Sequence, residues 1–292
     1  MTPTEKQHRA KRRRAAVRHA VFTRAPNQLM RGLLSRVRPG KDFCLNRRTI
    51  LLDDLPDELC GLTITHLSDL HVGELMTPEH LPHIVEAVNT MGSDIVAVTG
   101  DFIDYSNEYV PAVVEAMKQL QAPLGVYHVL GNHDYLHDAK PLKDAFHEAG
   151  LNLLLDDVVT IKHEDRRIAI GGTDWARAGS TISRHVRKTA RKMPRNDLSL
   201  LLAHHPHSFD AACACGIDLT LSGHTHGGQL LLSKKRGAKG SIGLANLGFK
   251  YTRGHYRRGA SNLFISSGVG SWFPLRFRCP AEITVLELQN TY

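Results

Sequence analysis

The chain has 292 residues, of which 42% are hydrophobic and 23% are charged, an ordinary balance for a globular protein with a large core. No run of 18 apolar residues occurs, so the sequence offers no candidate for a membrane-spanning helix. The five cysteines are few, odd in number and irregularly spaced, which disfavours a disulfide framework and favours a reducing compartment.

Positive charge is concentrated in an N-terminal arm. Residues 1–48 hold 14 Lys/Arg and 2 Asp/Glu, whereas the remaining residues hold 23 Lys/Arg and 27 Asp/Glu. A twin-arginine export signal needs an apolar stretch after its basic run, and here Arg18, His19 and Arg24 interrupt that stretch. We therefore expect a cytoplasmic protein.

Residues 27–37 of the arm predict a basic helix with one apolar face. This face comprises Leu29, Met30, Leu33, Leu34 and Val37. Two interpretations stay open with equal weight. The helix either packs on the core, or lies on an anionic membrane and makes the protein peripheral at the inner membrane face. Nucleic acid is a third candidate partner for the arm.

Residues 62–67 are rich in apolar and β-branched side chains and predict a buried strand. Asp69 and His71 follow directly, and a carboxylate and an imidazole two residues apart can turn toward one metal ion. As a single copy, this pair is equally typical of a solvated turn.

The same pattern recurs after four later apolar runs. Residues 94–99 lead into Gly100-Asp101, residues 125–130 into Gly131-Asn132-His133-Asp134, residues 198–203 into His204-His205, and residues 219–222 into Gly223-His224-Thr225-His226. Because sites in α/β sheets form beyond the carboxyl ends of strands, five such strand ends indicate a metal site.

The other expected elements alternate with these strands. Helices are predicted at residues 77–91, 107–121, 138–149 and 182–193, a hairpin at 158–172, and further strands at 43–52, 263–267 and 283–288. This order predicts an α/β sandwich. We divide the chain into a basic arm, residues 1–50, and one catalytic domain, residues 51–292.

Taken in order, these motifs resemble the signature of the calcineurin-like metallophosphoesterases. The matching residues are Ser68-Asp69-Leu70-His71, Gly100-Asp101, Gly131-Asn132-His133-Asp134, His204 and Gly223-His224-Thr225-His226, and the likeness extends over residues 60–288. Residues 222–229, Ser-Gly-His-Thr-His-Gly-Gly-Gln, resemble a bacterial phosphodiesterase-like branch. The resemblance implies a four-layer α-β-β-α sandwich, with two mixed sheets flanked by helices.

The resemblance also implies a dinuclear site with two divalent cations, for which Mn, Fe or Zn fit the ligand types. One metal would be bound by Asp69, His71 and His226, the other by Asn132, His204 and His224, and Asp101 would bridge both. A metal-bound hydroxide would attack phosphorus. His133 would stabilise the developing charge or protonate the leaving oxygen, and Asp134 would orient His133.

Several neighbouring residues have other interpretations. His205 remains an alternative to His204 as the ligand, and His66 is interpreted as a packed core histidine. Asp104 is interpreted as a loop carboxylate, or one that supports the ligands, rather than as a further metal ligand. Arg276 either reaches a phosphate or is a solvated charge at a strand edge.

The predicted function is hydrolysis of a phosphodiester or pyrophosphate bond. One form of this hypothesis has a lipid-linked substrate such as UDP-2,3-diacylglucosamine, with the arm on the membrane. The alternative is a nuclease or a soluble nucleotide phosphodiesterase. A non-enzymatic scaffold is disfavoured because all seven ligand positions and His133 are present.

Overall fold

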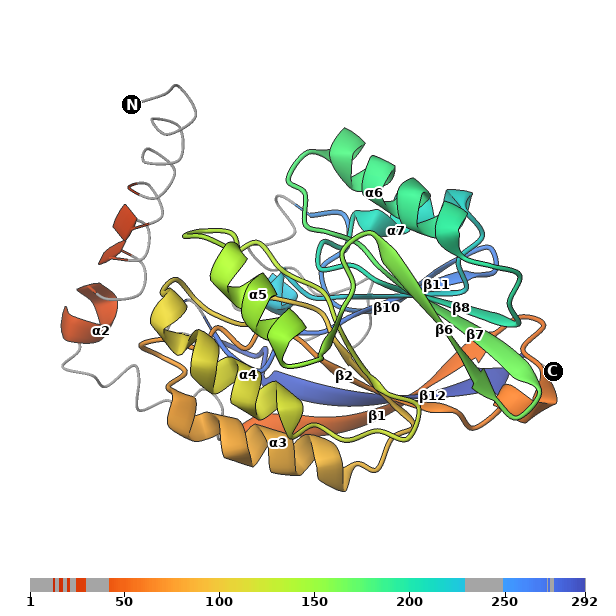
Figure 1. Cartoon of the computed structure of the whole chain (residues 1–292), viewed down its shortest axis with the longest axis horizontal. Coiled ribbons are helices and arrows are strands. Elements are labelled where there is room, and N and C mark those ends of the chain that lie inside the picture. Colours follow the sequence, from red (N-terminus) through yellow and green to blue (C-terminus); the bar gives the residue numbers. More distant parts are fainter. Residues whose placement is uncertain are drawn as a thin grey trace.

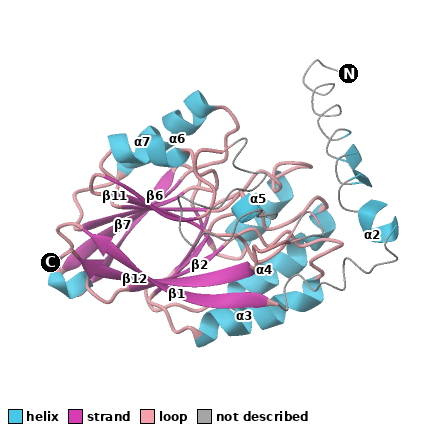
Figure 2. Cartoon of the chain, turned by 180° about the vertical axis from the view of Figure 1, so that it is seen from behind, coloured by secondary structure: helices cyan, strands magenta, loops and turns pink. Residues whose placement is uncertain are grey.

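Two β-sheets packed face to face form the centre of the protein, and helices cover both outer faces (Figure 2). The computed structural model describes residues 13, 16–17, 20–21, 25–29, 42–228, 249–271, 273 and 276–291. The predicted four-layer α-β-β-α arrangement is confirmed.

The first sheet has six strands in the order β1-β12-β2-β3-β4-β5. The strands are β1 (Phe43–Leu52), β12 (Ala281–Asn290), β2 (Thr63–Leu67), β3 (Ile95–Val98), β4 (Val126–His128) and β5 (Asn152–Leu153). β2, β3, β4 and β5 are parallel to one another, whereas β12 runs antiparallel to β2 and parallel to β1. The last strand of the chain therefore lies inside this sheet.

The second sheet also has six strands, in the order β10-β11-β9-β8-β7-β6. They are β10 (Gly254–Arg258), β11 (Ser261–Ile265), β9 (Leu219–Ser222), β8 (Leu198–Leu202), β7 (Arg166–Gly172) and β6 (Asp157–His163). The four central strands are parallel, and β10 and β6 close the two edges as antiparallel strands. The expected hairpin is β6–β7.

Each sheet has its own helical cover (Figure 1). The helices α3 (Leu81–Thr90), α4 (Val110–Lys118) and α5 (Lys140–Glu148) pack on the first sheet, and α6 (Gly179–Lys192) and α7 (Ser208–Ala214) pack on the second. Short 3-10 turns at Pro78–His80 and Asn107–Tyr109 precede α3 and α4. The predicted helices at 77–91 and 107–121 therefore each begin with a 3-10 turn.

One apolar core lies between the first sheet and its helices, and another fills the space between the two sheets. Ile64 and Ile95 of the first sheet and Leu200 and Leu221 of the second belong to it, and each is at most 1% exposed. The central parallel strands are buried on both faces, which explains why they read as continuous apolar runs in the sequence.

The boundary expected at residue 50 runs through β1, because this strand pairs with β12 along its whole length. In the arm, the structure describes the helix α2 (Ala25–Leu29), in which Leu29 is 84% exposed. Most of the helix expected at residues 27–37 lies outside the described residues. No helix in the described ranges is both long and apolar enough to cross a bilayer.

Candidate metal centre

The strand ends are in register on the side where the motifs lie. Leu67 of β2 pairs with Val98 of β3, which in turn pairs with His128 of β4. In the second sheet, Leu202 of β8 pairs with Leu221 of β9. The residues that follow these strands therefore emerge at one edge of the sandwich, where the two sheets meet.

A first set of donor atoms gathers around His71. Its Nε2 lies 2.9 Å from Nε2 of His226 and 3.4 Å from Oδ2 of Asp101. Asp69 Oδ1 lies 3.3 Å from His226 Nε2. All four residues are at most 2% exposed. Two imidazoles and two carboxylates with their donor atoms this close form a typical ligand set for a divalent transition metal.

A second set lies on the other side of Asp101. His204 Nε2 is 3.2 Å from Asp101 Oδ2 and 3.1 Å from Asn132 Oδ1. His224 Nδ1 is 2.5 Å from the same Asn132 oxygen. One oxygen of Asp101 therefore faces both sets, and the structure brings together all seven residues that the sequence analysis selected as ligands.

Backbone strain is concentrated at these residues. The φ angle is positive at five of the seven: Asp69 (54°), His71 (49°), Asp101 (55°), His224 (74°) and His226 (49°). A residue with a side chain rarely adopts this region, at a cost of about 1–3 kcal/mol each. Such a cluster indicates that the fold holds the side chains at a functional position rather than at a relaxed turn.

Two motif glycines make room for carboxylates. A Cβ at Gly131 would overlap the Asp101 carboxylate, and a Cβ at Gly223 would overlap that of Asp69. Glycine is therefore required at both positions for steric reasons, independently of any turn preference.

The pKa values of two histidines indicate that the site favours positive charge. Burial lowers the pKa of His71, but the carboxylates of Asp104, Asp69 and Asp101 outweigh it and raise the pKa to about 10. Burial likewise opposes protonation of His204, yet Asp101 raises its pKa to about 9. A metal that binds these imidazoles must displace their protons.

The pKa values of two other histidines and two carboxylates in the site are lowered. Burial lowers the pKa of His224 and His226 well below the usual range. Burial alone would raise the pKa of Asp69 and Asp101, but the neighbouring histidines lower both. The carboxylates are thus charged, and His224 and His226 are neutral as ligands require.

The histidine of the third motif is held by Asp104. His133 Nδ1 donates to the backbone oxygen of Asp104 at 2.7 Å and lies 3.1 Å from its carboxylate. The same carboxylate is 3.5 Å from His71 Nδ1. We expected Asp134 to orient His133, and expected Asp104 to be a loop carboxylate or one that supports the ligands rather than a metal ligand. The expectation for Asp134 is wrong, because the structure gives that position to Asp104.

Asp134 instead joins two motif loops. Its buried carboxylate accepts backbone N–H groups of Asp101, Phe102, Ile103 and Gly131, at 2.8–3.2 Å. Burial and the nearby Asp101 raise its pKa to about 7, while the N–H donors oppose the rise. This residue fixes the loop after β3 to the loop after β4.

The buried hydroxyl groups of Ser68 and Thr99 form a hydrogen-bonded chain that ends on the predicted ligand Asp69. Ser68 Oγ donates to Asp69 Oδ2 at 2.6 Å, and Thr99 Oγ1 donates to Ser68 at 2.8 Å. His204 Nδ1 donates to the backbone oxygen of Thr99 at 2.6 Å, which directs Nε2 toward the donor cluster. His66 bonds Thr99 Oγ1 at 2.8 Å and is fully buried, a packed core histidine as expected.

Arg276 neither reaches toward solvent nor lies at a strand edge. Its Nη2 donates to the backbone oxygens of Ser267 (2.9 Å) and Gly270 (2.6 Å) and lies 3.3 Å from Gly268 O and His226 Nδ1. The loop that it binds is the segment between β11 and β12.

This loop is hydrogen-bonded to the backbone of the first motif. Val269 N donates to Ser68 O at 3.0 Å, and Gly270 N donates to Asp69 O at 2.8 Å. Glu282 holds the same loop by accepting Ser267 N at 2.8 Å. Only the spacing of Arg276 and Glu282 near the end of the chain could have suggested this clamp, and we did not identify it from the sequence.

The choice between His204 and His205 follows from these contacts. His205 stacks on His224 with ring centroids 4.8 Å apart, and it also contacts Phe249. It therefore packs behind a predicted ligand, whereas His204 faces Asp101 and Asn132.

Comparison with known proteins agrees with this geometry. Residues 62–228 match the family described as calcineurin-like phosphoesterase. An uncharacterized metallophosphoesterase of Helicobacter pylori (strain J99) is 32% identical over 243 residues, which cover 82% of this chain and 62% of that protein. The uncharacterized metallophosphoesterase YkuE of Bacillus subtilis is 30% identical over 248 residues, 83% of this chain and 84% of that protein.

Among solved structures, a dimetal phosphatase from Danio rerio has a TM-score of 0.42 at 13% identity, and the match covers 78% of this chain and 93% of that one. The chain spans 62% of the length of the Helicobacter relative. The family match, the relatives and the convergence of the motif residues on one buried cluster lead to one conclusion: the chain belongs to the calcineurin-like phosphoesterase family.

Proposed function

We propose that the protein is a dinuclear metal-dependent phosphoesterase that hydrolyses a phosphodiester or pyrophosphate bond. The observation that carries this proposal is the position of Asp101, whose Oδ2 lies 3.4 Å from His71 Nε2 and 3.2 Å from His204 Nε2. A carboxylate oxygen between two imidazole-rich sets is the arrangement that a bridged metal pair requires.

The roles of the ligands follow from the two sets. Asp69, His71 and His226 would hold one cation, Asn132, His204 and His224 the other, and Asp101 both. When bound, divalent cations such as Mn, Fe or Zn supply Lewis acidity toward the phosphoryl oxygens and an activated water.

His133 is the proposed acid. Because its Nδ1 donates to Asp104, Nε2 is the ring nitrogen that exchanges a proton with the substrate. Its ring lies edge-on to His71 with centroids 4.4 Å apart, which places it at the margin of the first ligand set. From there it can protonate the oxygen that leaves phosphorus.

For the substrate, we propose a lipid-linked phosphoester such as UDP-2,3-diacylglucosamine. The support is the arm, in which residues 1–48 carry 14 Lys/Arg and 2 Asp/Glu, a composition suited to an anionic membrane surface. Residues 1–50 then act as a peripheral membrane contact, and residues 51–292 form the catalytic unit. A nuclease or soluble nucleotide phosphodiesterase is the competing assignment.

A metal and turnover assay tests the proposal. The purified full chain is stripped with a chelator, reloaded with Mn²⁺, and assayed on bis-aryl phosphodiesters, aryl monoesters, UDP-linked diacyl sugars and oligonucleotides. We expect two metals per chain and the highest kcat/KM on the diacyl sugar. One metal per chain, or no turnover of any phosphoester, would overturn the dinuclear assignment, and a preference for oligonucleotides would favour the nuclease.

A further inference from the structure

The outer helix α6 concentrates positive charge on an otherwise acidic body. Residues 175–196 contain seven Lys/Arg and no Asp/Glu. Outside this segment and residues 1–48, the chain holds 16 Lys/Arg against 27 Asp/Glu. An anionic surface would therefore repel most of the body and attract this segment.

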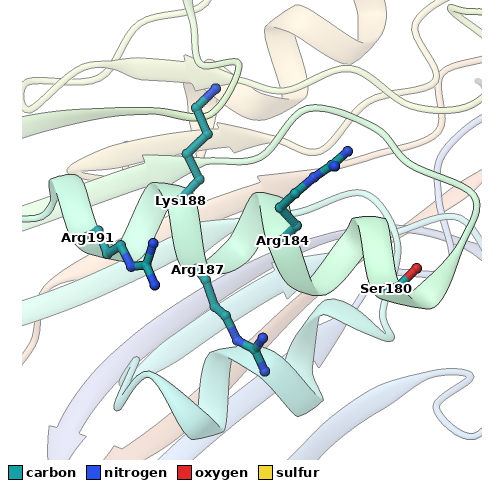
Figure 3. Close-up of a pocket in the computed structure, with 5 residues that line it drawn as sticks. All are labelled: Ser180, Arg184, Arg187, Lys188 and Arg191. Atoms are coloured by element: carbon teal, nitrogen blue, oxygen red, sulfur yellow. The ribbon is translucent and has the colours of Figure 1, made fainter.

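The helix presents its charges outward because its apolar residues are used in packing. Ile182, Val186 and Thr189 are 5%, 0% and 0% exposed. On the outer side, Ser180, Arg184, Arg187, Lys188 and Arg191 line a hollow of about 550 Å³. Figure 3 shows the arginine and lysine side chains extending away from the helix axis on both flanks.

Three of these cations are unused by the fold. Lys188 pairs with Asp156 at 3.2 Å, and Lys192 pairs with Asp157 at 3.0 Å. By contrast, Arg184, Arg187 and Arg191 are exposed and make neither an ion pair nor a hydrogen bond within the described part of the chain. Arg184 and Arg191 lie seven positions apart on α6, so the charged row extends for about 10 Å along the helix.

We propose that Arg184, Arg187 and Arg191 form a second membrane contact, which docks α6 on the headgroups of an anionic bilayer. The contact is electrostatic and superficial, because none of the exposed large hydrophobic side chains in the described ranges lies on α6. The helix lies on the outer side of the second sheet, where a surface can approach it (Figure 2). Among the described residues, none that lines the hollow is aromatic, so they offer no stacking platform of the kind that single-stranded nucleic acid uses.

The position of α6 connects this surface to the metal centre. The helix links the parallel strands β7 and β8, so its first turn begins at the edge of the sheet that carries the metal-ligand loops. Docking on α6 places that edge beside the bilayer rather than facing away from it. This last step rests on the proposed lipid-linked substrate, whereas the docking itself does not.

Vesicle binding by the full chain tests the docking. The variant R184Q/R187Q/R191Q removes three cations and keeps good helix formers. The control K118Q/K140Q/K162Q removes three exposed cations from other elements. Binding to phosphatidylcholine vesicles with 30% phosphatidylserine is measured by co-sedimentation at 50 mM and 500 mM salt, beside melting curves.

At 50 mM salt we expect the α6 variant to bind about 100-fold more weakly than the wild type, since each of the three cations near the surface contributes about a fivefold effect. The control should change much less, and the difference should shrink at 500 mM salt. A Lys triple at the same α6 positions should bind like the wild type. Equal losses in the α6 and control variants would overturn the proposal.

Two further outcomes would also overturn it. Loss of binding in the Lys triple would mean recognition of a defined phosphate rather than a surface. Tighter binding of a labelled 20-mer oligonucleotide than of the vesicles, lost in the α6 variant, would assign the row to nucleic acid. Turnover of a soluble diester should be unchanged in every variant, so vesicle results and catalytic failure stay distinguishable.

Discussion

The two sheets contribute unlike halves to the candidate metal centre. The first sheet supplies the oxygen ligands, Asp69, Asp101 and Asn132, together with a single imidazole. The second sheet supplies only imidazoles, from the loops after β8 and β9. Neither half contains a complete set, so metal binding depends on how the sheets are held together.

The supports of the two halves differ as well. In the first sheet, Asp134 and the Ser68–Thr99 hydroxyl chain fix the loops from within. The His226 side is held from outside, by Arg276 and the loop before β12. The same loop also bonds the backbone of Ser68 and Asp69, so with Arg276 it ties the His226 side to the internally supported first half.

The shared residue gives the largest expected effect. Asp101→Ala should lose both metals, because Asp101 completes each set and joins the two halves. Turnover should fall to the uncatalysed level, and elemental analysis should find less than one metal per chain. His205→Ala is the control, since its ring packs on those of His207, His224 and Phe249. Two retained metals with near-normal turnover in Asp101→Ala would refute the bridge.

Removal of the proposed acid should separate chemistry from metal binding. His133→Ala should keep both metals and lower kcat by about 10²–10⁴, the usual contribution of one positioned acid. Substrates with very acidic leaving groups need no proton, so their loss should be smaller. Metal lost together with activity would instead make His133 a ligand.

The two carboxylates near His133 should give different phenotypes. Asp104→Ala should lower kcat by about 10- to 100-fold and shift its pH profile, because the His133 ring loses the carboxylate 3.1 Å away but keeps its bond to the backbone oxygen of residue 104. Asp134→Ala should chiefly lower the melting temperature, by about 5–10 °C, because four buried N–H groups lose their acceptor. Identical phenotypes would show that the loops and the ring act as one unit.

The smallest effect is a change of stability with pH. The pKa of His71 is raised to about 10 and that of His204 to about 9, so both stabilise the metal-stripped protein most below their unfolded pKa near 6.5. This stabilisation is lost as the pH rises through 9 to 10. The melting temperature of stripped protein should therefore fall between pH 7.5 and 10.

Metal-loaded protein is the control for this prediction, because bound metal replaces both protons. Its melting temperature should be nearly constant over the same range. Titration calorimetry at pH 7.5 in buffers of different ionisation enthalpy should detect about two protons released as the metals bind. Release of no proton would contradict the charged state of His71 and His204.

Sequence alone was sufficient where a signal is local. The continuous apolar runs that end at Asp69, Asp101 and His224 marked buried parallel strands, and the strand rule placed their ends at one edge. The residues that converge in the candidate metal centre were therefore recognisable without coordinates. Element boundaries were less accurate, since α6 begins at Gly179 and not at residue 182.

Sequence alone was insufficient where a partner is set by the path of a loop. Asp134 is adjacent to His133 in the chain, but its side chain turns back to the backbone of residues 101–103. Asp104, 29 positions before His133, reaches its ring because the loops after β3 and β4 pack together. Arg276 was misread for the same reason, since its acceptors are backbone oxygens that no residue pattern reveals.

The central position of β12 has a consequence for the order of folding during synthesis. This strand is the last of the chain, yet it lies between β1 and β2, and the loop before it clamps Asp69. While the ribosome still holds residues 281–290, β1 has no partner strand among the described elements and one edge of β2 is open. The nascent chain therefore passes through a stage with exposed strand edges, which favour aggregation and chaperone binding. The metal-ligand loops reach their final geometry only after residues 281–290 have left the ribosome and paired.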